Sequence, residues 1–261
     1  MKNYKLFLLD MDGTIYLDND LFDGTLDFLD YVRRTGGRYI FLTNNSSKSV
    51  DKYIEKLAAL GIAAAAEDFL TSTDATVLYL QKQNHHKIYA LGTASFREQL
   101  ARAGLPVTDK LQDGIDCLCM GFDTELTFQK LEDACILLGR GVDYIATNPD
   151  WVCPTSYGYV PDCGSVSQML CHATKRMPKF IGKPEPDMAL LAIEKTGFSK
   201  AETLLLGDRL YTDIACGAAA GVDTVFVLSG EGTLCDLEKS EVKPRFVYQN
   251  IRALYADLKK G

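Results

Sequence analysis

Residues 5–14 read Lys-Leu-Phe-Leu-Leu-Asp-Met-Asp-Gly-Thr, and this stretch decides the fold. An apolar run without a polar face predicts a strand that is buried on both sides, as in a parallel sheet. The run ends in two carboxylates, Asp10 and Asp12, and Gly13 indicates that the backbone turns there. Neighbouring carboxylates repel unless a cation lies between them or one keeps a proton, so this strand end is a candidate catalytic edge. A solvated acidic turn is the alternative.

The composition is that of an ordinary soluble globular protein. The chain has 261 residues, 47% hydrophobic and 24% charged, with a formal net charge of -7. This length suits one large or two unequal domains. The negative charge gives no basic field for nucleic acid or an anionic membrane, so neither is expected as a partner. The first strand follows the N-terminus directly and no apolar run has the length of a signal or membrane helix, so we expect a cytoplasmic protein.

The cysteines and histidines offer little for a zinc site. Eight cysteines are scattered without a Cys-x-x-Cys pair, and the three histidines are His85, His86 and His172. Buried free thiols are a more common role for such cysteines than a metal or redox centre.

Strands and helices alternate along the chain, which predicts an α/β fold with a parallel sheet. After the first strand, apolar runs at 38–42 and near 69–72 alternate with helical patterns at 25–34 and 50–60. A polar hinge at 82–87 indicates a domain boundary.

The same alternation starts again in residues 86–178, which predicts a smaller α/β domain inserted into the first. Residues 1–85 and 179–261 then form the two parts of a core domain with a Rossmann-like, doubly wound parallel sheet. Near the end of the insertion, residues 148–159 are rich in proline, glycine and aromatic side chains. We interpret this tract as a loop and a candidate contact surface.

Four apolar runs end in polar residues that should meet at one edge of the sheet. These residues are Asp10 with Asp12, Thr43 with Asn44, Lys183, and Asp208. In an open parallel sheet the carboxyl ends of the strands point to one edge, where such folds bind ligands. Carboxylates suit Mg2+, hydroxyls and backbone amides suit phosphate oxygens, and a lysine neutralises their charge. The set predicts a phosphoryl-transfer site.

Four motifs in this order resemble those of the haloacid dehalogenase (HAD) superfamily of phosphatases. They are Asp-Met-Asp-Gly-Thr at 10–14, Leu-Thr-Asn-Asn at 42–45, Gly-Lys-Pro at 182–184, and Gly-Asp-Arg-Leu-Tyr-Thr-Asp at 207–213. The inserted domain resembles the type IIA cap of the NagD and p-nitrophenylphosphatase branch, since Ala-Thr-Asn-Pro-Asp at 146–150 is similar to its cap signature. The resemblance spans nearly the whole chain.

The resemblance implies chemical roles for the four aspartates of these motifs. Asp10 is then the nucleophile that forms an aspartyl phosphate, and Asp12 is the general acid and base. Mg2+ is held by Asp10, the backbone carbonyl of Asp12 and Asp208. Asp213 stands behind these ligands or is reached through water.

The resemblance also assigns Thr43, Asn44 and Lys183 to the phosphoryl oxygens. Taken singly, these residues have plainer interpretations. Thr43 suits a loop hydroxyl and Lys183 a solvated surface lysine, while Asp213 suits the N-cap of the next helix.

The implied function is Mg2+-dependent hydrolysis of small phosphomonoesters, of the sugar phosphate or nucleoside monophosphate class. The inserted domain is expected to close over the strand ends and contact the leaving group. Its candidate contact residues are Asn148, Asp150, Tyr157, Tyr159 and Asp162. Relatives commonly carry a small residue at the place of Asp162.

Two other function classes remain open on the sequence. A phosphotransferase or phosphomutase uses the same aspartyl phosphate but passes it to a bound alcohol. A catalytically idle protein would keep the fold and bind a phosphorylated metabolite, although the intact motif residues argue against it. The resemblance to cap-paired relatives further suggests a homodimer through the cap.

Overall fold

The computed structural model describes residues 4–155 and 157–260. These residues form two compact units. Unit 1 comprises the described residues of Met1–Thr43, Asp51–Leu70 and Lys183–Gly261, and unit 2 comprises Asn44–Val50 and Thr71–Gly182. The domain limits 1–85, 86–178 and 179–261 remain predictions, while the compact units group residues 44–50 and 71–85 with the inserted block.

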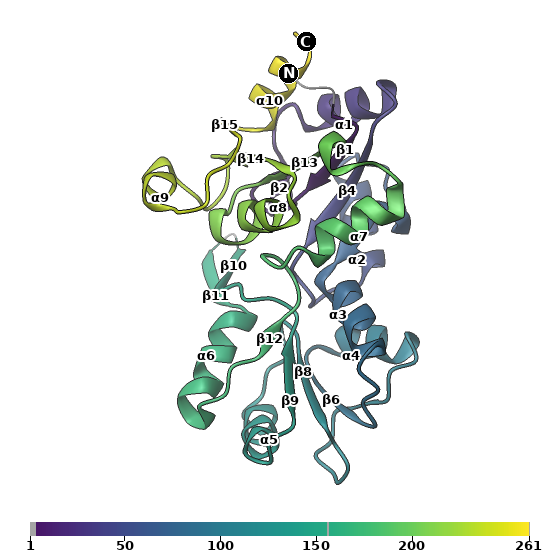
Figure 1. The fold of residues 1–261 in the computed structure, drawn as a ribbon, viewed down its shortest axis with the longest axis vertical. Coiled ribbons are helices and arrows are strands. Elements are labelled where there is room, and N and C mark those ends of the chain that lie inside the picture. Colours follow the sequence, from purple (N-terminus) through teal and green to yellow (C-terminus); the bar gives the residue numbers. More distant parts are fainter. Residues whose placement is uncertain (1–3, 156, 261) are drawn as a thin grey trace. The chain divides into compact units, whose positions relative to one another are not determined.

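A six-stranded sheet in the order β15-β14-β13-β1-β4-β5 forms the centre of unit 1 (Figure 1). Its strands are β1 Leu6–Leu9, β4 Arg38–Thr43, β5 Phe69–Thr71, β13 Thr203–Gly207, β14 Asp223–Val227 and β15 Phe246–Tyr248. β1 pairs in parallel with β13 and β4, and β14 pairs in parallel with β13 and β15. The carboxyl ends of these strands therefore meet at one edge.

Helices cover the sheet of unit 1. They are α1 Thr25–Arg34, α2 Val50–Ala59, α7 Asp187–Thr196, α8 Ala215–Ala220, α9 Leu234–Lys239 and α10 Ile251–Leu258. The smaller elements are the antiparallel pair β2 Tyr16–Leu17 and β3 Asp20–Leu21, the 3-10 turns η1 Ala66–Asp68 and η2 Lys200–Glu202, and the π-helix η3 Leu210–Ile214. All four residues of β1 are buried, and the ring of Phe7 packs edge-on against Phe28 of α1 at 5.4 Å between centroids. The sequence pattern of residues 5–9 thus reflects burial on both faces.

Unit 2 contains a second sheet, with five strands in the order β12-β9-β8-β6-β7. Its strands are β6 Ile88–Leu91, β7 Val107–Thr108, β8 Cys117–Met120, β9 Asp143–Ala146 and β12 Lys179–Phe180, and its helices are α3 Ser72–Gln81, α4 Ala94–Arg102, α5 Phe128–Gly139 and α6 Cys163–Thr174. Every strand pair is parallel. The predicted α/β class, with a parallel core sheet and an inserted second sheet, is confirmed.

The loop predicted at residues 148–159 is wrong over much of its length. The tract contributes to an antiparallel hairpin of β10 (Val152–Thr155) and β11 (Gly158–Pro161), in which Pro154 lies opposite Tyr159. Proline lacks the N–H that a central strand needs, but each strand of a two-stranded hairpin has a free edge where proline is tolerated. Ser156, in the same tract, lies outside the described residues.

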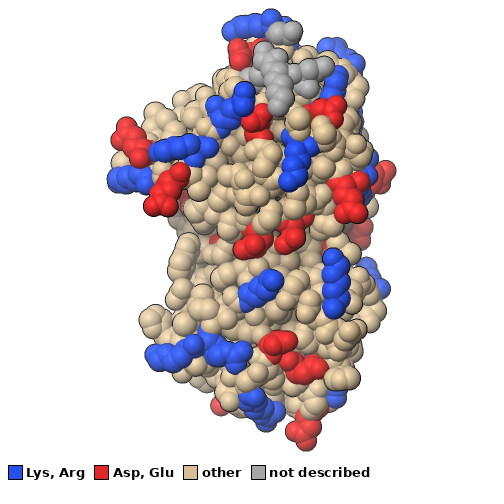
Figure 2. Space-filling model, viewed as in Figure 1, with Lys and Arg blue, Asp and Glu red and all other residues tan. Residues whose placement is uncertain are grey.

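The surface carries both signs of charge. Figure 2 shows one face, on which basic and acidic side chains are interspersed, in keeping with 28 basic and 35 acidic residues in the chain. Over residues 4–155 and 157–260, no helix is both long and apolar enough to cross a membrane.

Candidate active site

Five side chains of unit 1 gather at the carboxyl edge of its sheet. Asp10 follows β1, and Asp208 follows β13. Asp213 lies in η3, which begins two residues after Asp208, and Thr43 is the last residue of β4. Lys183 begins the last segment of unit 1 and reaches the same place, since it contacts Asp10 and Asp213.

Lys183 lies at the centre of this group and is only 2% exposed. Its Nζ donates hydrogen bonds to Asp10 Oδ1 and Asp213 Oδ1, both at 2.6 Å, and to the carbonyl oxygen of Leu42 at 3.3 Å. Burial alone would lower the pKa of this ammonium, but the charges of Asp10 and Asp213 outweigh burial and raise the pKa above its usual range. Lys183 is therefore a buried cation, and the interpretation as a solvated surface lysine is wrong.

Three carboxylates lie close together here, and two of them, Asp10 and Asp213, contact Lys183. One oxygen from each of Asp10, Asp208 and Asp213 lies within 4.8 Å of the others. Burial, followed by the charge of Asp10, raises the pKa of Asp213 to about 6, although Lys183 opposes the shift. Burial and the charges of Asp10 and Asp213 likewise raise the pKa of Asp208 well above its usual range. One lysine does not balance three carboxylates, so the site favours a further cation.

The surroundings of Asp208 fit a hard cation such as Mg2+. Its Oδ2 accepts a hydrogen bond from the backbone N–H of Glu231 at 2.7 Å, whereas its buried Oδ1 has no hydrogen-bond partner among the described residues. A Cβ added at Gly13, which has φ +90°, or at Gly230 would collide with this carboxylate. An orphaned carboxylate oxygen beside two other carboxylates is the donor set that Mg2+ prefers.

Asp12 has different surroundings from Asp10. Its Oδ2 accepts a hydrogen bond of 3.5 Å from the hydroxyl of Tyr16, and its Oδ1 lies 3.8 Å from Nζ of Lys56. The Lys56 ammonium also lies 3.6 Å from the centre of the Tyr16 ring. Asp10, in contrast, is held by Lys183 and lies 3.4 Å from Oγ1 of Thr14. Two carboxylates in unlike environments can perform different roles in proton and phosphoryl transfer.

Comparison with known proteins identifies the family to which this chain belongs. A profile described as haloacid dehalogenase-like hydrolase matches residues 7–106, and a second HAD-hydrolase-like profile matches residues 180–254. The chain is 35% identical over 261 residues to an acid sugar phosphatase of Staphylococcus aureus, covering 100% of both chains. The chain belongs to the HAD-like hydrolases.

Solved structures place this HAD-like hydrolase in the class IIA branch, with NagD and the p-nitrophenylphosphatases. A 4-nitrophenylphosphatase from Thermotoga maritima is 39% identical with a TM-score of 0.91, and 97% of each chain is covered. A putative NagD protein is 34% identical with a TM-score of 0.90 and 99% coverage of both chains. A glycerol phosphate phosphatase from Mycobacterium tuberculosis, solved in complex with magnesium, is 30% identical with a TM-score of 0.90, covering 97% of this chain and 76% of that one.

Two consecutive residues of this HAD-like hydrolase that are predicted to bind phosphate belong to different units. Thr43 is buried at the end of β4 in unit 1. Asn44 belongs to unit 2, where its side-chain amide donates a 2.7 Å hydrogen bond to Asp150 Oδ2. Their contact with phosphate remains a prediction.

The five candidate substrate contacts in unit 2 form two groups. Asn148, Asp150 and Asp162 are buried, and Asn148 donates hydrogen bonds to Asp150 Oδ2 at 2.9 Å and to Asp162 Oδ1 at 3.1 Å. Asp162 also caps the N-terminus of α6. Tyr157 and Tyr159, on the hairpin, are instead 82% and 62% exposed. The first three residues therefore bind one another within unit 2, whereas the two rings are exposed. Contact of these five residues with substrate remains a prediction.

The loop after β14 also contacts the site, and it was not among the predicted site residues. Ser229 Oγ donates a 2.7 Å hydrogen bond to the carbonyl oxygen of Gly13, and the N–H of Glu231 binds Asp208. The signal was present, since Leu-Ser-Gly-Glu-Gly at 228–232 directly follows the apolar strand at 223–227. Polar and glycine residues at another strand end are the pattern that identified Asp10.

Proposed function

We propose that this HAD-type phosphatase hydrolyses small phosphomonoesters, of the sugar phosphate or nucleoside monophosphate class, with Mg2+ as its cofactor. The contact between Lys183 and Asp10, beside the orphaned oxygen of Asp208, carries the proposal. It combines a fixed nucleophile, a buried positive charge and a place for a hard cation. The names of the relatives, which include acid sugar phosphatase and glycerol phosphate phosphatase, support this substrate class.

Asp10 acts as the nucleophile in this account. Its carboxylate oxygen forms a bond to phosphorus while the bond from phosphorus to the leaving alkoxide breaks. Lys183 fixes this carboxylate at 2.6 Å and places a positive charge next to the phosphoryl oxygens. Asp10, the carbonyl of Asp12 and Asp208 would hold Mg2+, and its positive charge would offset the repulsion between carboxylate and phosphate.

Asp12 acts as the general acid and base in this account. Its carboxylate lies outside the Lys183 ion pairs and is partly exposed beside Lys56 and Tyr16. It protonates the leaving oxygen as the aspartyl phosphate forms, and then removes a proton from the water that attacks phosphorus in the second step. The second step restores Asp10 and releases inorganic phosphate.

Removal of the metal tests the proposal. With Mg2+ we expect inorganic phosphate release from a panel of sugar phosphates, glycerol phosphate and nucleoside monophosphates. With a chelator we expect a loss of at least about 100-fold, because several kcal/mol of transition-state stabilisation come from the cation. Ca2+ should not restore the rate, since it takes more ligands at longer distances. Activity in excess chelator, or equal rates with Ca2+, would contradict the proposal.

Turnover of substrate without matching release of inorganic phosphate would identify a phosphotransferase.

Selectivity is proposed to depend on the exposed rings of unit 2. Tyr159→Ala should change the ranking of substrates by kcat/KM, by about 10-fold between the best and a poor substrate, because a ring that packs on a sugar contributes roughly 1–2 kcal/mol. Phe128→Ala, which removes a ring that is 81% exposed on α5, is the matched control. An unchanged ranking in Tyr159→Ala would assign selectivity to other residues.

Location and assembly are proposed from the sequence. All eight cysteines lie in the described part of the chain and are free thiols, which accords with a reducing, cytoplasmic compartment. The homodimer through the inserted domain likewise stays a proposal, drawn from the resemblance of that domain to type IIA caps.

A further inference from the structure

The loop after β14 holds the Asp208 carboxylate through backbone atoms. The N–H of Glu231 donates to Asp208 Oδ2 at 2.7 Å, and the N–H of Gly232 donates to the carbonyl oxygen of Asp208 at 3.1 Å. Glycine at position 230 lets the loop pass close to the carboxylate, since a Cβ there would collide with it. The direction of the Asp208 side chain therefore depends on where this loop lies.

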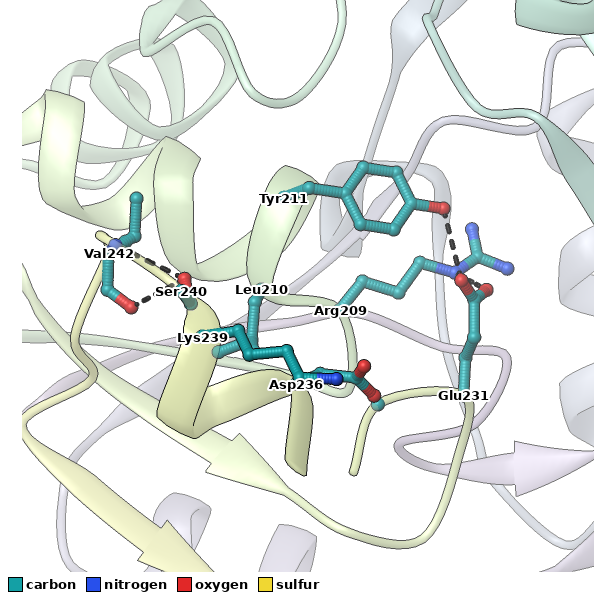
Figure 3. A pocket seen from close by; sticks show the side chains of 9 residues that line it. Arg209, Leu210, Tyr211, Glu231, Asp236, Lys239, Ser240 and Val242 are labelled. Atoms are coloured by element: carbon teal, nitrogen blue, oxygen red, sulfur yellow. Dashed lines mark hydrogen bonds and ion pairs between the residues drawn. The ribbon is translucent and has the colours of Figure 1, made fainter. Parts of the chain in front are cut away.

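The side chain of Glu231 also holds the loop after β14, through contacts with Arg209 and Tyr211. Its Oε2 lies 2.7 Å from Nε of Arg209, and its Oε1 accepts a 3.2 Å hydrogen bond from the hydroxyl of Tyr211. Figure 3 shows these three side chains pointing toward one another. Arg209 and Glu231 are only 14% and 29% exposed, so this ion pair is stronger than one in full solvent.

The ion pair also connects the two buried carboxylates of the site. The N–H of Arg209 donates a 3.0 Å hydrogen bond to Asp213 Oδ2, just as the N–H of Glu231 donates to Asp208 Oδ2. The residues whose backbones hold the two carboxylates are thus joined by their own side chains. A change in one loop would move both carboxylates relative to Asp10.

Packing beside the Glu231 side chain is incomplete, although Ser229 Oγ also holds the loop through the carbonyl oxygen of Gly13. A cavity of about 440 Å³ lies beside the pair and is lined in part by Arg209, Tyr211, Glu231 and Gly232. Figure 3 labels the first three of these residues. A void gives no packing support to the residues that line it. The side-chain contacts of Glu231 therefore add to the hydrogen bonds of Ser229 and Gly232 in fixing the loop.

We propose that Glu231 is a positioning residue for the metal site. Its carboxylate, held by Arg209 and Tyr211, keeps the loop in place. The hydrogen bond from the Glu231 N–H to Asp208 Oδ2 then orients the Asp208 carboxylate toward Asp10 and Asp213. This inference rests on the proposed function, because it assumes that these carboxylates bind Mg2+. Groups that orient metal ligands typically change metal affinity by 10–100-fold when they are removed.

Metal affinity is the readout that separates positioning from a general structural role. Mg2+ binding is measured by isothermal titration calorimetry in wild type, Glu231→Ala, Glu231→Gln and the control Glu238→Ala, whose carboxylate is exposed on the neighbouring α9. Glu231→Ala should weaken binding by about 10-fold or more. Glu231→Gln loses the charge that pairs with Arg209 but keeps an acceptor for the Tyr211 hydroxyl, and should recover part of the loss. Glu238→Ala should bind as wild type does. Thermal unfolding in chelator should remain within a few degrees of wild type for all three variants.

Each outcome decides the proposal. Equal Mg2+ affinity in Glu231→Ala and Glu238→Ala would overturn the positioning role and leave the metal site standing. If wild type itself bound no Mg2+, the metal site of the proposed function would fail, and the role of Glu231 with it. If Glu231→Ala were to unfold, Glu231→Gln would decide, since the proposal requires a loss of Mg2+ affinity smaller than about 10-fold together with faster amide exchange at position 231. Unchanged affinity or unchanged exchange in Glu231→Gln would then overturn it.

Discussion

Replacement of Asp10 by asparagine is expected to abolish turnover while the protein remains folded. The amide cannot attack phosphorus, so the loss in kcat/KM should be on the order of 10⁴-fold or more, as when other covalent nucleophiles are removed. The amide oxygen still offers an acceptor to the buried ammonium of Lys183, which contacts Asp10 at 2.6 Å in the native site. Folding should therefore tolerate the change better than catalysis does.

The control is Asp20→Asn, which removes one exposed carboxylate from β3 in the same unit. It should leave kcat/KM unchanged, and circular dichroism should confirm that both variants are folded. Retention of even a few per cent of wild-type phosphate release by Asp10→Asn would remove Asp10 from the nucleophilic role.

Lys183→Met should destabilise the protein and stop catalysis together. The ammonium lies between Asp10 and Asp213 and is almost entirely buried, so its removal leaves carboxylates without their counter-charge. Breaking a buried ion pair in this way costs about 3–5 kcal/mol of the free energy of unfolding. Turnover should fall by at least about 100-fold, because a positive charge next to the phosphoryl oxygens is lost.

Denaturant unfolding in chelator and in Mg2+ measures the effect of Lys183→Met. The destabilisation should be larger in chelator, since a bound cation replaces part of the missing charge. Lys82→Met, at an exposed position just after α3, should change the free energy of unfolding by less than about 0.5 kcal/mol. A loss below about 1 kcal/mol for Lys183→Met would show that the carboxylates do not depend on this lysine.

The position of the core site could be predicted from the sequence because it depends on local pattern and one topological rule. The apolar runs before Asp10, Thr43 and Asp208 are strands β1, β4 and β13, which are neighbours in one parallel sheet. Their carboxyl ends must then converge. The charge of the site followed from the residue types alone.

The detailed contacts could not be predicted, because they depend on tertiary distances. Asp213 was expected behind the metal ligands or reached through water, and this stays a prediction. Its 2.6 Å contact with Lys183 and its closeness to Asp10 and Asp208 could not be predicted. The π-helix η3 that brings it there has no clear sequence signature. The role of Glu231 depends on two loops that approach only in the folded chain.

The candidate substrate contacts show the same limit. Residue type suggested that Asn148, Asp150 and Asp162 could bind a hydroxyl, but burial and mutual hydrogen bonds decide whether they are accessible. No pattern in the sequence reports that burial. The hairpin that carries Tyr159 could not be predicted for a different reason. Its proline and glycine residues are equally typical of a loop.

The most direct test of the central claim is to identify the residue that carries the phosphoryl group during turnover. Asp12→Asn is mixed with 4-nitrophenyl phosphate and Mg2+, because this leaving group departs without an acid while hydrolysis of the intermediate still needs a base. We predict a burst of about one nitrophenolate per enzyme. Acid quenching followed by peptide mass spectrometry should place one phosphoryl group on Asp10. A phosphoryl group on another residue, or none on Asp10 while nitrophenolate is released, would contradict the account.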